Sequence, residues 1–378
     1  MKAVCVSCFN YYDIRVKHIE NYLYQKGYEV NYITSDFDHI SKKKFRINKP
    51  NVTQIQAKPY YKNLSVQRLY SHYHFAKDTI REVEKIKPDL LYVILPPNYL
   101  TRLVSKYKKA NDVKLIYDVY DMWPEAFPLE GVKKPLEIPF KLWRALRDNH
   151  LATADVVFTE CDLYREKLEH LLAGVDTDTL YLTKEKLLYE NTVSISEDAV
   201  EICYLGSINN IIDIPSIDRV LSEINKLKPV TLHIIGDGET REHFIKVLQN
   251  SNIRVVYHGK IYDERKKREI FDKCQFGINM MKSSVCVGLT MKSIDYFQAG
   301  LPILNNIKAD TTQIVEANGI GYNVTSENVE DIALEIVNLD IRELLAMRDR
   351  TSQIFDKFFS MEAFNSKLDD VLKGVLSK

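Results

Sequence analysis

The residues best suited to chemistry lie in one short stretch of the chain. Gly288 precedes a predicted short helix, and Gly300 ends that helix before an apolar strand. The first turn of a helix leaves backbone N–H groups without intrahelical acceptors, so it can bind an anion such as a diphosphate. Lys292 adds a positive charge, and Asp295, three residues later, projects from the same side of the helix. This combination predicts a nucleotide site, with phosphates at the turn and ribose hydroxyls on Asp295.

The same stretch, GLTMKSIDYFQAGLPIL at 288–304, resembles the donor-site helix of the GT-B glycosyltransferases. The similarity is to the group 1, family 4-like branch of the bacterial surface-polysaccharide type, which carries GLPxKxxEYxAxGxPVI. Asp295 lies where that family has the second glutamate of its Glu-x7-Glu motif. The first glutamate would fall near Val285 to Val287, and this chain has none there. Because this glutamate is missing, three questions stay open: which sugar is donated, whether the anomeric configuration is retained or inverted, and whether the protein is active.

The phosphates of a donor need positive charge or free amides. The candidates in this chain are Lys282 and Lys292, together with the amides of Leu289 and Thr290. Lysine is an adequate phosphate partner because it acts as a point charge. In an alternative interpretation, Lys292 only pairs with Asp295 on an exposed helix, which contributes a few tenths of a kcal/mol.

Two further strand ends are expected to contact the donor. In many relatives an Arg follows the glycine at the end of the second domain's first strand and clamps the diphosphate. Here Gly206 is followed by Ser207, so this turn lacks that charge. Lys260 follows the glycine that ends another predicted strand. In relatives the backbone after this glycine contacts the nucleobase, so the resemblance makes Lys260 a candidate contact for the edge of the base.

The acceptor-side candidates follow strands of the first half. The stretch YDVYDMWPE at 117–125 is similar to the HDLWPE loop of bacterial relatives, with Tyr120 in place of the histidine and Trp123 retained. The Asp121 carboxylate could take a proton from an acceptor hydroxyl, or could bind loop amides instead. In the first loop, Asp13 is expected to cap a helix, with a catalytic role as the alternative. Arg15 is a candidate phosphate contact.

Apolar runs alternate with helical stretches along the whole chain, which is typical of parallel sheets covered on both faces. The predicted strands are 2–7, 28–34, 90–95, 114–119, 156–159, 202–205, 231–235, 254–258, 276–279 and 302–304. The predicted helices include 14–26, 67–86, one from 162, 263–274, and a C-terminal helical tail with a break near 359–360.

A chain of 378 residues suits two domains. We expect an α/β protein of the GT-B type, with two doubly wound Rossmann-like domains that face a central cleft. The acceptor-side domain is predicted at 1–183 plus 360–378, because the FSMEAF segment resembles the place where the family's last helix crosses back. The polar stretch 184–199 is predicted to be a linker, and 200–359 the nucleotide-sugar-binding domain.

The charge is unevenly distributed although the net charge is zero. Residues 1–109 contain 20 Lys or Arg and 9 Asp or Glu, a net charge of +11. This favours an anionic partner, and a membrane surface fits better than nucleic acid because no nucleic-acid motif accompanies the charge. A solvated surface without a partner is the alternative. No apolar run is long enough to span a membrane and no signal-peptide pattern is present, so we expect a cytoplasmic protein, peripheral on the inner face of the cell membrane.

No cofactor or metal is expected, since no Asp-x-Asp pattern suggests a metal-held nucleotide and no zinc constellation is visible. Cys5 and Cys8 lie on a predicted strand and are interpreted as core residues. His72 and His74 are interpreted as packing residues.

The resemblance predicts a metal-independent glycosyltransferase. It would move a sugar from a UDP- or dTDP-sugar to a saccharide acceptor that is lipid-linked, in bacterial capsule, exopolysaccharide or cell-surface glycan synthesis. A non-catalytic GT-B subunit and a GT-B nucleotide-sugar epimerase remain as alternatives, because a fold alone does not decide function.

Overall fold

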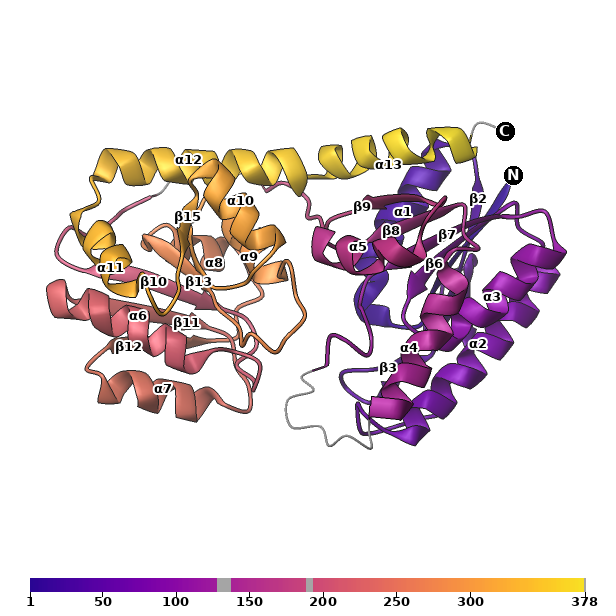
Figure 1. The fold of residues 1–378 in the computed structure, drawn as a ribbon, viewed down its shortest axis with the longest axis horizontal. Coiled ribbons are helices and arrows are strands. Elements are labelled where there is room, and N and C mark those ends of the chain that lie inside the picture. Colours follow the sequence, from indigo (N-terminus) through magenta and orange to yellow (C-terminus); the bar gives the residue numbers. More distant parts are fainter. Residues whose placement is uncertain (128–136, 188–192, 377–378) are drawn as a thin grey trace. The chain divides into compact units, whose positions relative to one another are not determined.

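The structure is a computed structural model that describes residues 1–127, 137–187 and 193–376 (Figure 1). The chain forms two compact units, the first comprising Met1–Tyr181 with Asn365–Lys378 and the second Leu182–Phe364. Each unit contains one parallel sheet, of seven strands in the first and six in the second. The predicted α/β class with two Rossmann-like sheets is therefore confirmed.

The first unit has the strand order β5-β2-β1-β6-β7-β8-β9. Because the chain moves outward from β1 to β2 and then returns to β6 on the other side, the order reverses between β1 and β6, where open α/β sheets bind ligands. The strands are β1 (Lys2–Ser7), β2 (Glu29–Ser35), β5 (Val52–Ile55), β6 (Leu90–Leu95), β7 (Lys114–Val119), β8 (Val156–Thr159) and β9 (Asp176–Thr179). A separate antiparallel pair consists of β3 (Phe37–Asp38) and β4 (Lys43–Lys44).

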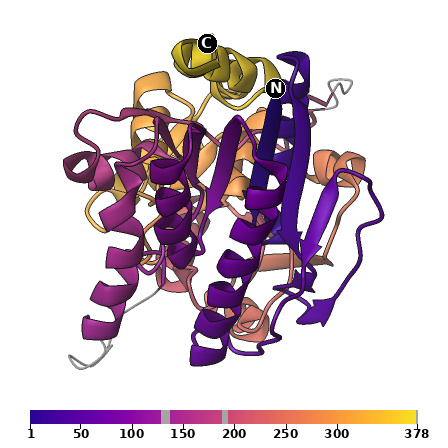
Figure 2. The same cartoon turned by 90° about the vertical axis from the view of Figure 1, so that its right-hand side faces the viewer.

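Helices of the first unit pack against this sheet and each other. They are α1 (Asp13–Gln25), α2 (Val66–Ile86), α3 (Asn98–Ala110), α4 (Glu137–Leu151) and α5 (Asp162–Leu168), with 3-10 turns η1 (Asn10–Tyr12) and η3 (Glu169–Leu171). Helix α3 contacts both α2 and α4, so the three form one helical layer (Figures 1 and 2). The last helix, α13 (Met361–Leu376), reaches the first unit, where Asp369 accepts a hydrogen bond from Tyr22 at 2.9 Å.

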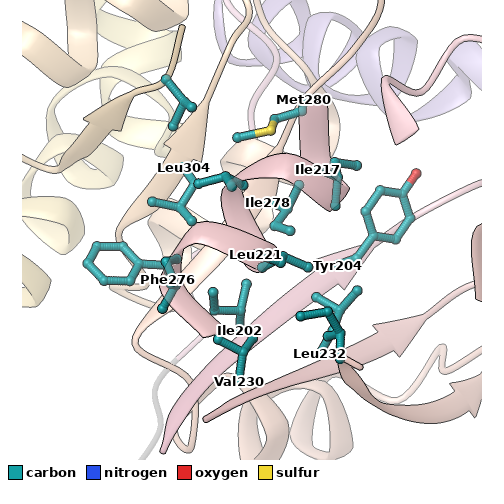
Figure 3. Packing of buried hydrophobic residues seen from close by; sticks show 14 of the residues in the cluster. Ile202, Tyr204, Ile217, Leu221, Val230, Leu232, Phe276, Ile278, Met280 and Leu304 are labelled. Atoms are coloured by element: carbon teal, nitrogen blue, oxygen red, sulfur yellow. The ribbon is translucent and has the colours of Figure 1, made fainter. Parts of the chain in front are cut away.

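The second unit has the strand order β12-β11-β10-β13-β14-β15. The strands are β10 (Val200–Leu205), β11 (Val230–Ile235), β12 (Arg254–Gly259), β13 (Phe276–Asn279), β14 (Ile303–Asn305) and β15 (Gly321–Asn323). The helices are α6 (Ile214–Leu227), α7 (Arg241–Asn250), α8 (Glu264–Phe271), α9 (Met291–Gln298), α10 (Asp310–Asn318), α11 (Val329–Asn338) and α12 (Ile341–Phe358). Figure 3 shows part of the core, in which Ile202, Leu232 and Ile278 from three strands face Ile217 and Leu221 of α6.

The predicted strands 2–7, 90–95, 114–119, 156–159 and 276–279 coincide with the observed bounds of β1, β6, β7, β8 and β13. The break between α12 and α13 also lies where it was predicted, and the Ser360 hydroxyl there accepts a hydrogen bond from the amide of Ala363 at 3.1 Å. Cys5 and Cys8 are buried and unpaired, as expected for core residues.

Candidate donor and acceptor sites

The carboxyl ends of β10, β11 and β12 enclose a pocket of about 270 Å³ in the second unit. Gly206, Ser207 and Lys260, three of the predicted donor residues, line this pocket together with Asp237 and the exposed Tyr262. The pocket lies at the strand edge where ligands of parallel sheets bind. Its size is near the lower end of the range for small-molecule sites.

Two glycine turns approach each other closely beside this pocket. Gly206 has a φ of +119° and Gly236 a φ of +148°. A Cβ atom on Gly236 would lie 1.9 Å from the carbonyl oxygen of Gly206. Only glycine permits both the positive φ and this approach of the two backbones, so these residues fix the shape of the strand edge.

The predicted anion site at the start of α9 needs one correction. Thr290 is the N-cap, and its hydroxyl and that of Ser293 each accept the other residue's amide, at 3.2 and 3.3 Å. The Thr290 amide is therefore occupied by this capping box. In the described part of the chain, the amides of Leu289, Met291 and Lys292 have no acceptor, so these three are free to donate to an anion.

A ladder of asparagine side chains holds this turn in place. The Thr290 hydroxyl donates to Asn279 at 2.8 Å, and the amide group of Asn279 donates to Asn305 at 3.0 Å. Asn305 in turn donates to Asn323 at 2.9 Å. The ladder crosses the ends of three neighbouring strands, β13, β14 and β15, so it couples the α9 turn to the sheet.

Changing Thr290→Val is expected to remove both the cap and the bond to Asn279. Loss of an N-cap costs about 1–2 kcal/mol of stability, and the misplaced amides should also weaken nucleotide binding. Thermal unfolding and calorimetry with UDP measure the two effects. The matched control is Asp340→Ala, which removes the cap of α12, where Asp340 accepts from the Arg342 amide at 2.8 Å. An equal loss of UDP affinity in both variants would contradict a specific role for the α9 turn.

Lys292 is half-buried and has no carboxylate within 4 Å among the described residues. Its ammonium lies 4.8 Å from the centre of the Tyr204 ring. Burial lowers the pKa of Lys292 from 10.5 to about 8. A poorly solvated cation on a helix whose first turn has free amides is an electrostatic match for a phosphate.

Asp295 does not pair with Lys292. Its Oδ1 atom contacts the ammonium of Lys184 and lies 3.9 Å from that of Lys267. Lys267 also pairs with Glu264 at 2.7 Å. The alternative in which Lys292 serves only as a partner of Asp295 is therefore wrong, and a ribose hydroxyl would have to meet the other oxygen, Oδ2.

Lys282 is exposed on the segment that leads to Gly288. Its amide donates to the carbonyl oxygen of Ile211 at 2.9 Å, while its side chain forms no ion pair within the described residues. The carbonyl of Gly288 accepts from the Thr311 hydroxyl at 2.6 Å, which anchors the other end of the turn.

In the first unit, Asp121 ends a chain of phenol hydroxyls. The Tyr12 hydroxyl donates to Asp121 Oδ2, and the Tyr11 hydroxyl donates to that of Tyr12 at 3.3 Å. Burial raises the pKa of Asp121 to about 6, although the Tyr12 hydrogen bond and the charge of Arg68 oppose the increase. A carboxylate with such a pKa is ionised at neutral pH and is basic enough to accept a proton.

Sequence reasoning missed Arg68, the cation of this cluster. Its side chain is 1% exposed, lies 3.9 Å above the centre of the Trp123 ring, and has no carboxylate within 4 Å in the described chain. Burial and the Arg68 charge lower the pKa of His39 to about 3 and keep His72 neutral as well. No local sequence pattern identifies Arg68, because its surroundings come from several strand ends.

Arg15 was predicted on the acceptor side as a candidate phosphate contact, but it lies in the interior. Its guanidinium pairs with Asp118 at 2.8 Å and donates to the carbonyl oxygens of Leu180 and Tyr181 at 2.6 and 2.8 Å. These contacts hold the end of β9 against α1. We therefore no longer propose Arg15 as a substrate contact.

The other acceptor-side predictions have mixed surroundings. Asp13 is the first residue of α1 rather than its cap, and its carboxylate accepts from the Tyr32 hydroxyl at 2.7 Å. Tyr120 is half-buried, with its ring centre 4.3 Å from that of Tyr12. Trp123 is buried in an aromatic cluster, so it positions the Asp121 loop. Asp121 and Tyr120 thus share one cluster, while Asp13 has a separate partner.

Within the described ranges, no group of three or more His, Cys, Asp or Glu side chains is arranged to hold a metal ion. None of the helices described here has the length and apolar character needed to cross a bilayer.

Comparison with solved structures defines the fold. Sucrose-phosphate synthase from Thermosynechococcus elongatus has a TM-score of 0.72 at 12% identity, covering 100% of this chain and 99% of that one. Anabaena HepE in complex with UDP-glucose has a TM-score of 0.64 at 12% identity, covering 99% and 100%. The lipopolysaccharide outer core galactosyltransferase WaaB has a TM-score of 0.69 at 12% identity, covering 99% and 100%. The architecture is GT-B-like.

The second unit also resembles a known family in sequence. Residues 199–340, which contain the pocket and the α9 turn, match the family described as Glycosyl transferases group 1. No curated protein sequence matches the chain. The second unit is thus similar to group 1 glycosyl transferases, and the fold of the chain is GT-B-like.

Proposed function

We propose that this protein is a glycosyltransferase that moves a sugar from UDP- or dTDP-sugar to a lipid-linked saccharide in bacterial capsule, exopolysaccharide or cell-surface glycan synthesis. The observation that carries the proposal is the start of α9, where, among the described residues, the Lys292 ammonium has no carboxylate partner and three amides have no acceptor. Among the similar structures, HepE is in complex with UDP-glucose, which supports a UDP donor. The absent first glutamate of the Glu-x7-Glu motif leaves the sugar itself unassigned.

The proposed reaction is a displacement at the anomeric carbon. The acceptor hydroxyl oxygen forms a bond to this carbon as the bond to the diphosphate oxygen breaks, and the nucleotide diphosphate leaves with the electron pair. Lys292 and the amides of Leu289 and Met291 stabilise the charge that develops on the leaving group. The hydroxyl proton passes to Asp121 in an inverting reaction, or to the departing phosphate oxygen in a retaining one.

An anionic membrane surface on the cytoplasmic side is the proposed location of the acceptor. The net charge of +11 in residues 1–109 supports it. Each basic residue near such a surface contributes about 1 kcal/mol at low ionic strength, so the attraction should weaken steeply with salt.

The nucleotide assignment is tested by calorimetry with UDP, dTDP and GDP. We expect UDP or dTDP to bind, and Asp295→Ala to weaken binding by about 10- to 100-fold, since a charge-assisted hydrogen bond contributes about 1.5–3 kcal/mol. Asp331→Ala, an exposed carboxylate on α11, is the matched control. Unchanged affinity in Asp295→Ala would remove the ribose assignment.

Product analysis then separates the transferase from the alternative activities. A transferase consumes the sugar nucleotide only with an acceptor, apart from slow hydrolysis. An epimerase would convert the free donor without one, and a non-catalytic subunit would do neither. Conversion of free UDP-sugar to its epimer would overturn the proposed reaction.

A further inference from the structure

A second cavity lies within the first unit, between α2, α3 and α4. It has a volume of about 390 Å³, and its walls are mostly apolar. The lining residues are Leu69, His72, Tyr73, Asn98, Tyr99, Pro139, Leu142, Trp143 and Leu146. None of them is among the donor or acceptor candidates described above.

The rim of this cavity carries apolar side chains that face solvent. On α2, Val66, Leu69, Tyr70 and Tyr73 are exposed at spacings of three, four and seven residues, so they form one stripe. On α4, Ile138 and Leu142 are 65% and 66% exposed and lie one turn apart. Contiguous exposed apolar surface of this kind marks an interaction site.

The inner side of the cavity is polar and incompletely satisfied. His72 and Asn98 are 3% and 1% exposed, and within the described ranges His72 Nε2 and Asn98 Oδ1 have no hydrogen-bond partner. A buried polar atom without a partner costs about 1–3 kcal/mol, so a ligand that supplies the partner would be favoured. The cavity thus changes from apolar at the rim to polar inside.

The polar side adjoins the loop that carries Asp121. Asn98 donates to the carbonyl oxygen of Trp123 at 2.8 Å, and the His72 ring stacks on the Trp123 ring with centres 6.1 Å apart. A ligand that enters past the apolar rim would therefore bring its polar end toward this loop.

Positive charge surrounds the cavity. The Lys77 ammonium lies 5.4 Å from the centre of the Tyr73 ring, and Lys141 is exposed next to Leu142. Helix α3 carries four Lys or Arg and no Asp or Glu. A second copy of this face would repel the first, whereas an anionic amphiphile would satisfy both the charge and the apolar rim.

We propose that this cavity binds the apolar chain of a lipid-linked acceptor, whose polar linkage is held by His72 and Asn98. The inference rests on the proposed function and names the part of the acceptor that the first unit recognises. A lipid that rises from an anionic bilayer leads with its polar head and trails its chain, which matches the direction of the polarity change.

The test uses alkyl maltosides of increasing chain length, each below its micelle-forming concentration. Free maltose, which has the sugar head group without an alkyl chain, is the control. Binding is followed by the fluorescence of Trp143, one of two tryptophans in the chain. We expect affinity to rise about threefold to fourfold per added methylene group, and maltose to have no effect. Leu142→Glu should weaken dodecyl maltoside binding at least tenfold, while Leu334→Glu, at another exposed leucine on α11, should not.

The site would be overturned if the maltoside affinity did not depend on chain length, or if Leu142→Glu bound dodecyl maltoside as tightly as the wild type. It would also be overturned if sedimentation showed that Leu142→Glu loses a dimer while maltoside binding is kept. Binding of phosphatidylglycerol vesicles without chain-dependent maltoside binding would also overturn it, since the face would then be a membrane contact only. Calorimetry with UDP is the independent measurement. Chain-dependent binding without UDP binding would refute the proposed function and leave the cavity assignment standing.

Discussion

Asp121→Asn is expected to lower kcat for sugar transfer by about 10²- to 10⁴-fold, the usual contribution of a general base. The substitution keeps the size of the side chain and its contact with the Tyr12 hydroxyl, but an amide cannot take the acceptor proton. In the wild type, kcat/KM should fall with a slope of one proton below about pH 6, because burial raises the pKa of Asp121 to about 6. That limb of the pH profile should be absent from the residual activity of the variant.

The same substitution should not destabilise the protein. Because the pKa of Asp121 is about 6 when folded and near 3.8 when unfolded, the folded state binds more protons between these values. Stability is therefore lost as the pH rises through this window, and the ionised carboxylate is unfavourable at neutral pH. Asparagine removes this charge, so the Tm at pH 7.5 should be unchanged or higher.

Asp118→Asn provides the contrast, because it breaks the buried pair with Arg15. Removing one partner of such a pair costs about 3–5 kcal/mol, so its Tm should fall clearly. A strong loss of Tm in Asp121→Asn with normal kcat would show that Asp121 is a structural carboxylate. Normal kcat with a normal Tm would exclude it from catalysis and favour proton transfer to the departing phosphate.

The parts of the fold that were predictable from sequence are those whose cause is local. Strand β6 is buried along its whole length and β7 except for Lys114, so their bounds coincide with apolar runs bounded by Pro and Asp. The α9 turn was predictable for the same reason, since a glycine, a capping residue and a helical period occur within a few residues. Short strands such as β9, Asp176–Thr179, were missed because their polar sequence DTDT resembles a loop.

The side-chain partners in the sites were not predictable, because they come from distant parts of the chain. The Asp295 carboxylate is met by Lys184, 111 residues away, and no spacing rule relates the two. Arg68 acquires its role only when α2 places it against the Trp123 loop. Arg15 was misinterpreted because the sequence does not show what a basic side chain pairs with. An arginine near a phosphate-binding loop has the same local sequence whether its partner is a ligand or an internal carboxylate such as Asp118.

Lys292→Met is expected to weaken UDP binding by about 10- to 100-fold, the loss of one charge-assisted contact to phosphate. Stability should change in the opposite direction. The pKa of Lys292 is about 8 when folded and near 10.5 when unfolded, so the unfolded state binds more protons between these values and stability rises with pH through this window. Below pH 8 the buried ammonium is unfavourable, and methionine should leave the free energy of unfolding unchanged or raise it by about 1 kcal/mol.

The pH dependence of UDP affinity gives the decisive measurement for Lys292. Phosphate groups titrate near pH 6, so UDP keeps its charge between pH 7 and 9 while Lys292 loses its proton. Wild-type affinity should fall several-fold over this range, and the dependence should vanish in Lys292→Met but persist in Lys246→Met, an exposed site on α7. A pH-independent wild-type affinity, or a large drop in the Tm of Lys292→Met, would mean that the ammonium supports packing against Tyr204 rather than the diphosphate. A buried cation that binds the ligand lowers the stability of the free protein and raises its affinity for the ligand. A structural cation would raise stability and leave the affinity unchanged, so the two measurements together assign the role of Lys292 at the α9 turn.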